Sequence, residues 1–409
     1  MALPLPLAQS AVPAWQPTQP QRLLLQAVLA EDAIAREAWS AWKTLIDLDH
    51  LDEGSYLLLP RLYQRLRALG IDDALVQRCK GVYRHVWSRN QVKLRELTTL
   101  VQLLRAAQVE PMLLWGAALI LQPGQDPGIR RADDSALYVR FADMPQALAA
   151  LQDAGWVPTQ AKAADVVRSQ QHAIGLSLAG QSSCTLQWHV LPEWCQPDLE
   201  QSLWSQAIPV TLGAESVLSL HPADQFVCAT VRATQWATVP PFHWLADAAA
   251  LLQANAPDSA ALDSAVLESA ALDSATINWA AIIARAQQTE LIWALRQGLT
   301  QLHQILPHLA LSQPLADLAA QPLQPFERAE FNANARPHPV LGSLPTLWFQ
   351  FRRLQAQPDR DRHSPSFLAF LQQRWGIHHG WHLPRHLLTQ GRKRLKRLLA
   401  TQGNSPLKS

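Results

Sequence analysis

Two arginines and two aspartates stand close together in one short segment of the chain. Arg130 and Arg131 follow a turn-rich stretch, and Asp133 and Asp134 come directly before an apolar run. Carboxylate oxygens are the ligands that Mg²⁺ prefers, and arginine side chains bind phosphate groups well. Asp134 and Asp133 are therefore candidate metal ligands. The alternative is that both acids are solvated turn residues and both arginines ordinary surface residues.

A glycine that begins a small-residue segment lies shortly before these charges. Gly116 follows the apolar run Met112 to Trp115 and precedes the segment Ala117 to Leu121, which predicts a strand followed by a helix. The backbone N–H groups at the start of a helix are suited to bind an anion. Gly116 is thus a candidate phosphate contact, with Arg130 and Arg131 as further candidates for a triphosphate. A glycine that only lets a helix and a strand pack closely gives the same pattern.

Other catalytic patterns are missing from the sequence. It contains no Gly-x-Ser-x-Gly, no phosphate-binding lysine loop and no dinucleotide fingerprint. The histidine-rich run 378–382 has neither cysteine nor acid beside it, which makes it a weak zinc candidate. The four cysteines form no Cys-x-x-Cys pair, and the N-terminus lacks the basic residues of a signal peptide. These features predict a reducing, cytoplasmic location.

The candidate segments resemble a known family. Members of the uncharacterised nucleotidyltransferase family of bacteria read Leu-Lys-Gly-x-Ala-Leu, then Gly-x-Arg-Pro-x-Ser-Asp-x-Asp-Leu-Leu-Val. This chain is similar at Leu114 to Leu119 and at Asp126 to Val139. The resemblance extends over roughly residues 20–300 and includes Tyr83 to Asn90, Ala154 to Trp156, Thr185 to Trp188, Leu220 to Asp224 and Phe242 to Asp247.

The resemblance also implies a damaged catalytic site. The family's metal-binding acids are two residues at i and i+2 on one strand, with a third on the neighbouring strand. Asp134 stands at the first position, but Ala136 and Thr185 stand at the second and third, and Trp115 replaces the lysine. Asp133 is not a simple substitute, because adjacent strand residues face opposite sides. Mg²⁺ is therefore expected to bind weakly or not at all, and no other cofactor is expected.

Three functions remain open on this basis. The favoured hypothesis is a catalytically impaired family member that binds a nucleotide (NTP) or a protein partner. The second is an active, metal-dependent nucleotidyltransferase that uses Asp134 and acts on an unknown acceptor. The third is a non-enzymatic scaffold or interaction protein with a basic tail.

Composition sets the fold class. The chain has 409 residues, of which 48% are hydrophobic and 17% charged, so a substantial core is expected and global disorder is excluded. No apolar run reaches the length of a transmembrane helix. Helical spacing dominates, and period-two alternation is confined to the middle of the chain. We therefore expect a mostly helical α+β protein with a small, nucleotidyltransferase-like mixed sheet between N- and C-terminal helical domains.

Changes in composition and in hydrophobic periodicity divide the chain into six expected segments. They are a disordered leader (1–20), an N-terminal helical domain (21–108), the α/β core (109–192), a helical domain with a low-complexity insertion at 255–276 (193–306), a Pro-rich irregular segment (307–361) and a basic tail (362–409).

The tail carries nine lysines and arginines and no acid, whereas the rest of the chain is net acidic. Leucine spacing predicts an amphipathic helix at 385–399. Its cations could bind nucleic acid or an anionic membrane surface. Docking on the acidic body is the favoured alternative. The cations concerned are Arg392, Lys393, Arg394, Lys396 and Arg397.

Overall fold

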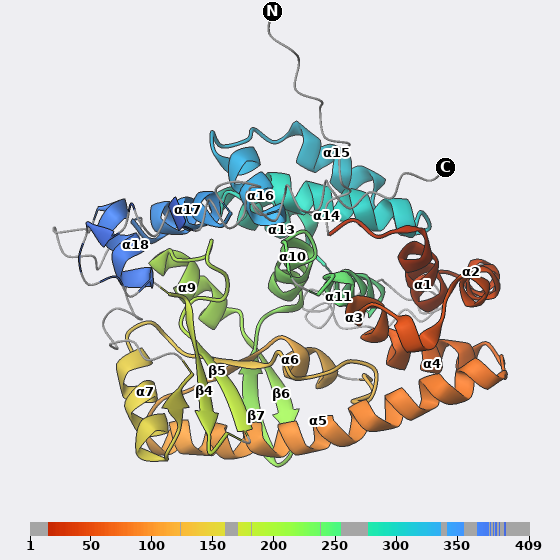
Figure 1. Cartoon of the computed structure of the whole chain (residues 1–409), viewed down its shortest axis with the longest axis horizontal. Coiled ribbons are helices and arrows are strands. Elements are labelled where there is room, and N and C mark those ends of the chain that lie inside the picture. Colours follow the sequence, from red (N-terminus) through yellow and green to blue (C-terminus); the bar gives the residue numbers. More distant parts are fainter. Residues whose placement is uncertain are drawn as a thin grey trace, which may run out of the picture.

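The computed structural model describes residues 15–389 except 123, 160–170, 181, 238, 255–276, 337–341, 356–365, 376, 378, 380, 383 and 385–387. The low-complexity insertion, nearly all of the helix predicted at 385–399 and the five cations of the tail lie outside the described residues. None of the described helices is long and apolar enough to cross a membrane. Figure 1 shows helices on both sides of a central sheet.

The first helices form a compact group at one end of the molecule. They are α1 (Gln19–Leu29), α2 (Asp32–Leu45), the 3₁₀ helix η1 (Leu48–His50), α3 (Glu53–Tyr56) and α4 (Leu59–Ala68). The prediction of a disordered leader is wrong for residues 15–20, because Trp15 is buried and α1 begins at Gln19. Pro20 favours this start, since proline is well tolerated in the first turn of a helix.

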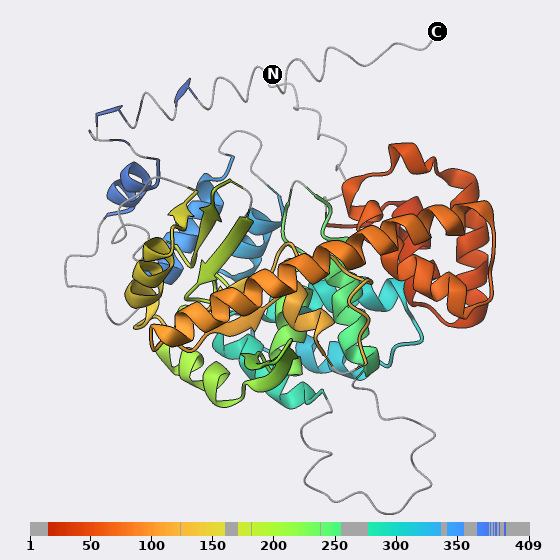
Figure 2. The same cartoon turned by 90° about the horizontal axis from the view of Figure 1, so that it is seen from below.

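A single long helix joins this group to the sheet. α5 (Ala74–Ala106) starts at Asp73, whose side chain accepts hydrogen bonds from the backbone N–H groups of Leu75 and Val76. Figure 2 shows α5 running from the N-terminal helices across to the strands. Its second half packs on the sheet through apolar residues at helical spacing, namely Leu97, Leu100, Val101 and Leu104.

The sheet has seven described strands in the order β3-β4-β5-β2-β1-β7-β6. They are β1 (Met112–Leu114), β2 (Ala136–Tyr138), β3 (Val157–Pro158), β4 (Ala173–Leu178), β5 (Ser182–Gln187), β6 (Ile208–Leu212) and β7 (Glu215–Ser219). β1 is antiparallel to β2 and parallel to β7, and β2 is parallel to β5, so the sheet is mixed, as expected. The predicted core, 109–192, is too short, because β6 and β7 lie beyond it.

Both faces of the sheet are covered. On one face, Leu113 and Leu137 share a core with α5 and α7 (Met144–Asp153). The neighbouring strand residues share a core with the helices of the other face; they are Met112, Leu114 and Tyr138. That face carries α9 (Pro197–Ser205), α10 (Pro222–Arg232), α11 (Phe242–Ala254), α13 (Trp279–Gln288) and α14 (Ile292–Ile305), and the short α6 (Gly116–Ile120) follows β1. The fold is mostly helical α+β, as the sequence predicts.

Most of the described residues in segment 307–361 lie in helices, so the prediction of an irregular segment is wrong. It contains α15 (Ser312–Ala320), α16 (Glu327–Ala335) and α17 (Leu344–Gln355), and α18 (Phe367–Trp375) follows. Its prolines do not interrupt these helices. Pro314 and Pro345 lie in the first turns of α15 and α17, where a missing N–H costs little.

Candidate active site

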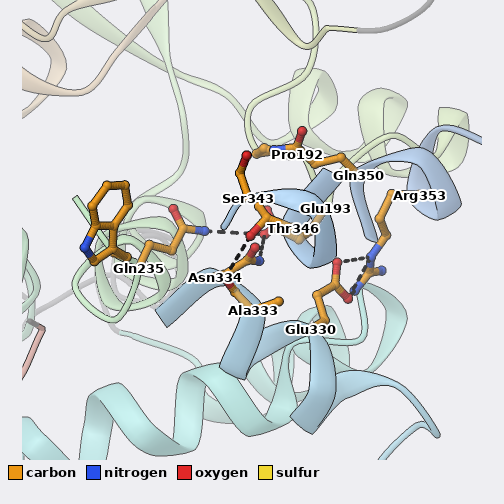
Figure 3. Close-up of a pocket in the computed structure, with 11 residues that line it drawn as sticks. Pro192, Glu193, Gln235, Glu330, Ala333, Asn334, Ser343, Thr346, Gln350 and Arg353 are labelled. Carbon is orange, nitrogen blue, oxygen red and sulfur yellow. Dashed lines mark hydrogen bonds and ion pairs between the residues drawn. The ribbon is translucent and has the colours of Figure 1, made fainter. Parts of the chain in front are cut away.

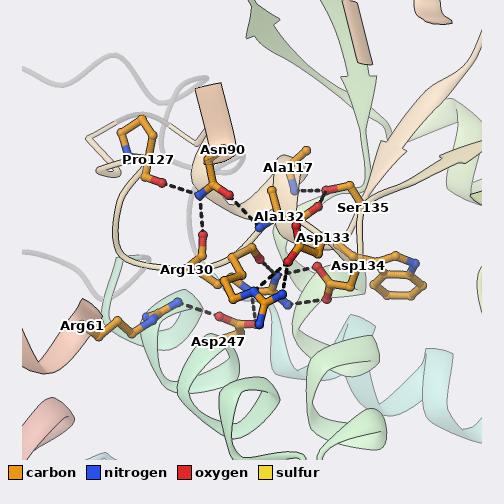
Figure 4. A network of polar contacts seen from close by, with 12 residues as sticks. Arg61, Asn90, Ala117, Pro127, Arg130, Ala132, Asp133, Asp134, Ser135 and Asp247 are labelled. Carbon is orange, nitrogen blue, oxygen red and sulfur yellow. Dashed lines mark hydrogen bonds and ion pairs between the residues drawn. The ribbon is translucent and has the colours of Figure 1, made fainter. Parts of the chain in front are cut away.

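Asn90 holds the loop that carries the predicted arginines and acids. Its side chain comes from the middle of α5 and is 1% exposed. Its amide group donates to the backbone carbonyls of Pro127 (2.6 Å) and Arg130 (2.7 Å), and its carbonyl accepts from the N–H of Ala132 (3.0 Å). Figure 4 shows these three bonds. One buried side chain thus fixes the path of the loop, because each bond satisfies a backbone group that water does not reach.

Arg130 is the centre of the charge network in Figure 4. Its Nη1 and Nη2 donate to the two oxygens of Asp134, both at 2.7 Å. Its Nε donates to Asp247 of α11 at 2.7 Å, and Arg61 of α4 donates to the other oxygen of Asp247 at 2.6 Å. The side chain of Asp247 is completely buried. The network therefore joins the loop, α4 and α11 through charges shielded from solvent.

The network determines the charge states around it. Burial opposes ionisation of Asp134, but the Arg130 guanidinium outweighs it and lowers the pKa of that carboxyl. Burial and the charge of Arg130 lower the pKa of His243, at the start of α11, to about 4. At neutral pH Asp134 is thus an ion-paired carboxylate and His243 an uncharged imidazole.

Gly116 lies directly against this ion pair. A Cβ at this position would come within 2.5 Å of Nη1 of Arg130 and Oδ1 of Asp134. The next backbone N–H, that of Ala117, donates to Oγ of Ser135 at 2.7 Å. The geometry therefore favours the packing interpretation of this glycine, because any larger residue would push the pair apart.

Trp115 occupies the position that the family gives to lysine. Its Nε1 donates to the side-chain oxygen of Gln187 at 2.7 Å, and its ring packs edge-on against Trp244. The guanidinium of Arg232 lies 4.4 Å from the centre of the Trp115 ring and 4.3 Å from that of Trp244. None of the described residues forms a hydrogen bond or ion pair with this guanidinium. Arg232 is thus held by two rings and carries a charge without a counterion.

The residues present do not fit a Mg²⁺ site. Ala136 and Thr185 are register partners on the parallel strands β2 and β5, so the two positions that should complete the acid cage are neighbours without a carboxylate. Asp133 points to other partners, since it forms ion pairs with Arg131 and Arg89. Within the described ranges, no three His, Cys, Asp or Glu side chains gather as a metal site requires.

A cavity of about 220 Å³ opens in front of the predicted residues. It is lined by Glu53, Leu57, Arg130, Arg131, Asp133, Asp134, Val239 and His243. The loop thus brings together four of the five candidates on the cavity wall and places Gly116 behind Arg130. Among the described residues behind the wall, Arg61 and Arg130 form ion pairs with Asp134 and Asp247, whereas Arg232 forms none, although the charges of Asp134 and Glu193 act on it.

Sequence reasoning missed Asn90, Arg61, Asp247 and Arg232. Asn90 and Asp247 do stand at the ends of segments that match the family pattern, Tyr83 to Asn90 and Phe242 to Asp247. That match could have marked them as site residues. Nothing local marks Arg61 or Arg232, because their partners are distant in the sequence.

The resemblance implies a mixed sheet in which a helix that begins with glycine follows the first strand and an acid precedes the second. The structure has this arrangement, with Gly116 at the start of α6 after β1 and Asp134 before β2. The model of a family described as uncharacterised nucleotidyltransferase matches residues 56–307, which is more than half of the chain. The chain therefore belongs to this family. Neither the curated proteins nor the solved structures contain a match.

Replacing Asp247 by alanine should destabilise the protein strongly. The change leaves the guanidinium of Arg61 without its ion-pair partner and removes one of the two carboxylates bonded to Arg130, and breaking a buried ion pair from one side costs about 3–5 kcal/mol. Asp133→Ala is the matched control, because its ion pairs are partly exposed and worth about 1 kcal/mol or less. Urea unfolding followed by circular dichroism measures both. Equal losses for the two variants would contradict this account of the network.

Replacing Asn90 by alanine should release the loop. Three backbone groups lose their partner, and a buried unsatisfied group costs about 1–3 kcal/mol. The N–H of Ala132 should then exchange with deuterium much faster than in the wild type. Ser88→Ala, an exposed change on the same helix, should leave both stability and exchange unaltered. Unchanged exchange at Ala132 in the Asn90 variant would show that the loop is held by other contacts.

Proposed function

We propose that this protein binds a nucleotide in the cavity beside Asp134 and does not transfer it. The observation that carries the proposal is the pair between Arg130 and Asp134, in which both oxygens of the surviving acid are bonded to a guanidinium. A divalent cation at this acid would have to displace the arginine or lie beside its positive charge. Metal-dependent nucleotidyl transfer needs at least one such cation clamped by several carboxylates, and two of the three family positions here are alanine and threonine.

The uncompensated charge of Arg232 supports an anionic ligand. A guanidinium presents several N–H donors in a plane that suits phosphate oxygens, and cation–π contacts with Trp115 and Trp244 hold it in place. Its charge also helps to lower the pKa of Asp134, so the field of Arg232 extends to the cavity wall. Arg131 adds an exposed guanidinium at the same wall, although Asp133 partly neutralises it. A nucleotide phosphate matches this excess of positive charge without a metal.

The same proposal places the protein in the cytoplasm, where nucleotides are abundant. All four cysteines are buried thiols, which supports a reducing compartment.

Nucleotide binding should be independent of Mg²⁺. Isothermal titration of the full chain with ATP, GTP, CTP and UTP, each with Mg²⁺ and with EDTA, should give the same affinity in both conditions for every nucleotide that binds. Arg232→Met should weaken binding, because it removes a positive charge that acts on Asp134 in the cavity wall, although Arg232 itself does not line the cavity. Arg95→Met, an exposed change on α5, is the control. Failure of all four nucleotides to bind, or an affinity that requires Mg²⁺, would overturn the proposal.

Transfer chemistry is tested separately with nucleotides labelled on the α-phosphate. We expect no label to become attached to the protein itself or to proteins of a cell extract, with or without Mg²⁺. Asp134→Asn should give the same result as the wild type. Labelling that requires Mg²⁺ and is lost in Asp134→Asn would instead establish an active nucleotidyltransferase.

A further inference from the structure

A second cavity, of about 260 Å³, lies on another side of the helical region. It is enclosed by the loop after β5, the residues after α10, and helices α16 and α17, as Figure 3 shows. Its lining is mainly polar or charged, with one tryptophan and two small apolar residues. The residues are Pro192, Glu193, Gln235, Trp236, Glu330, Ala333, Asn334, Ser343, Thr346, Gln350 and Arg353.

Glu193 is the unusual group in this cavity. Glu193 is only 3% exposed to solvent, and it lines the cavity. One carboxyl oxygen accepts two long hydrogen bonds, from the amides of Gln235 (3.4 Å) and Asn334 (3.3 Å). The other oxygen has no hydrogen-bond partner among the described residues. A buried acid with an unused oxygen is costly for the fold, which points to a missing donor.

The neighbouring charges do not supply that donor. Arg353 is held by Glu330, with its Nη2 at 2.8 Å from one carboxylate oxygen, and its Nη1 donates to the carbonyl of Thr289 at 2.9 Å. Two carboxylates and one guanidinium thus line the cavity, so an ionised Glu193 leaves one negative charge in excess. The charge of Arg232 acts on Glu193, but no ion pair joins them among the described residues.

The remaining lining suits a ligand that donates hydrogen bonds. The hydroxyl of Thr346 donates to the carbonyl of Ala333 at 2.8 Å, which leaves its oxygen free to accept. Ser343 and Gln350 add further oxygens to the wall. Trp236 is 48% exposed and lines the same cavity, and an indole ring is a good stacking surface for a cation. A carboxylate, several acceptors and an aromatic ring are what recognise an ammonium group.

We propose that this cavity binds a small organic cation through its ammonium group, with Glu193 as the counterion and Trp236 as the stacking surface. The proposal is independent of nucleotide binding, because it uses a different cavity and a ligand of opposite charge.

The titration of Glu193 allows a clean test. Burial and the neighbouring Glu330 raise its pKa to about 7, although Arg353 and Arg232 oppose the rise. An acid whose pKa is higher in the folded than in the unfolded state disfavours folding once it is ionised, so the cost is present above about pH 7 and lost at acidic pH. Glu193→Gln should therefore fold, and at pH 8 it should be at least as stable as the wild type.

The probes are a matched pair, benzylamine and benzyl alcohol, which share a ring and differ in charge. At pH 8, isothermal titration and saturation-transfer NMR on the full chain should detect benzylamine and not benzyl alcohol. Glu193→Gln should weaken benzylamine binding by about tenfold or more, because it removes the counterion. Trp236→Leu should weaken it less, since a stacking contact is worth about 1 kcal/mol at an exposed site.

Glu327→Gln is the control for a general loss of negative charge. Glu327 is a buried acid on α16, one of the helices beside the cavity. Its oxygens accept hydrogen bonds from the backbone N–H groups of Trp293 and Gln324. This variant should bind benzylamine like the wild type. Three results would overturn the proposal. They are equal binding of benzyl alcohol and benzylamine, an unchanged benzylamine affinity in Glu193→Gln, and no benzylamine binding at about 10 mM. A second comparison uses glucosamine and glucose, which differ in one amino group. Equal binding of these two sugars would indicate a neutral sugar site and not an amine site.

Discussion

The ion pair that Arg130 forms with Asp134 and Asp247 organises the whole centre of this molecule. One guanidinium bonds to the loop before β2 and to α11, and Arg61 extends the chain of charges to α4. These elements come from three distant parts of the sequence. Charges buried to this degree are stable only when each is paired, so the arrangement tolerates little rearrangement at any of its members. Gly116 belongs to the same constraint, because only a residue without a Cβ fits against the pair.

The network also explains why the site differs from a metal cage. A cage of carboxylates is held together by the divalent cation that it binds, and without that cation its acids would repel each other. Here a guanidinium already satisfies the remaining acid, and Ala136 and Thr185 add no further negative charge. Alanine is well suited to the position, since Ala136 is buried in the hydrophobic core. The fold of the family thus holds an arginine–carboxylate pair at this position of the sheet.

The two cavities differ in sign, and α10 ends near both. Arg232, the last residue of α10, carries an uncompensated positive charge close to Asp134. Glu193 carries an uncompensated negative charge at the second cavity, and its pKa responds to the same arginine. No ion pair joins these two groups among the described residues, although the charge of Arg232 acts to lower the pKa of Glu193. The two cavities thus differ in the sign of the nearby charged group that has no ion pair of its own.

The sequence by itself determined the class of the fold and the position of the loop that lines the first cavity. Helical periodicity, the period-two strands at 174–178 and 184–191 and the pattern around Gly116 and Asp134 are local features, and local features are readable without a structure. The same reading failed where partners are distant. β7 joins the sheet through a parallel pairing with β1 across about a hundred residues, and β6 pairs with β7. Within the proline-rich segment, Pro314 and Pro345 lie in the first turns of helices. Only the tertiary structure shows which groups join the Arg130–Asp134 pair in one network, because Asp247, Arg61 and Asn90 come from helices that are distant in the sequence and adjacent in space.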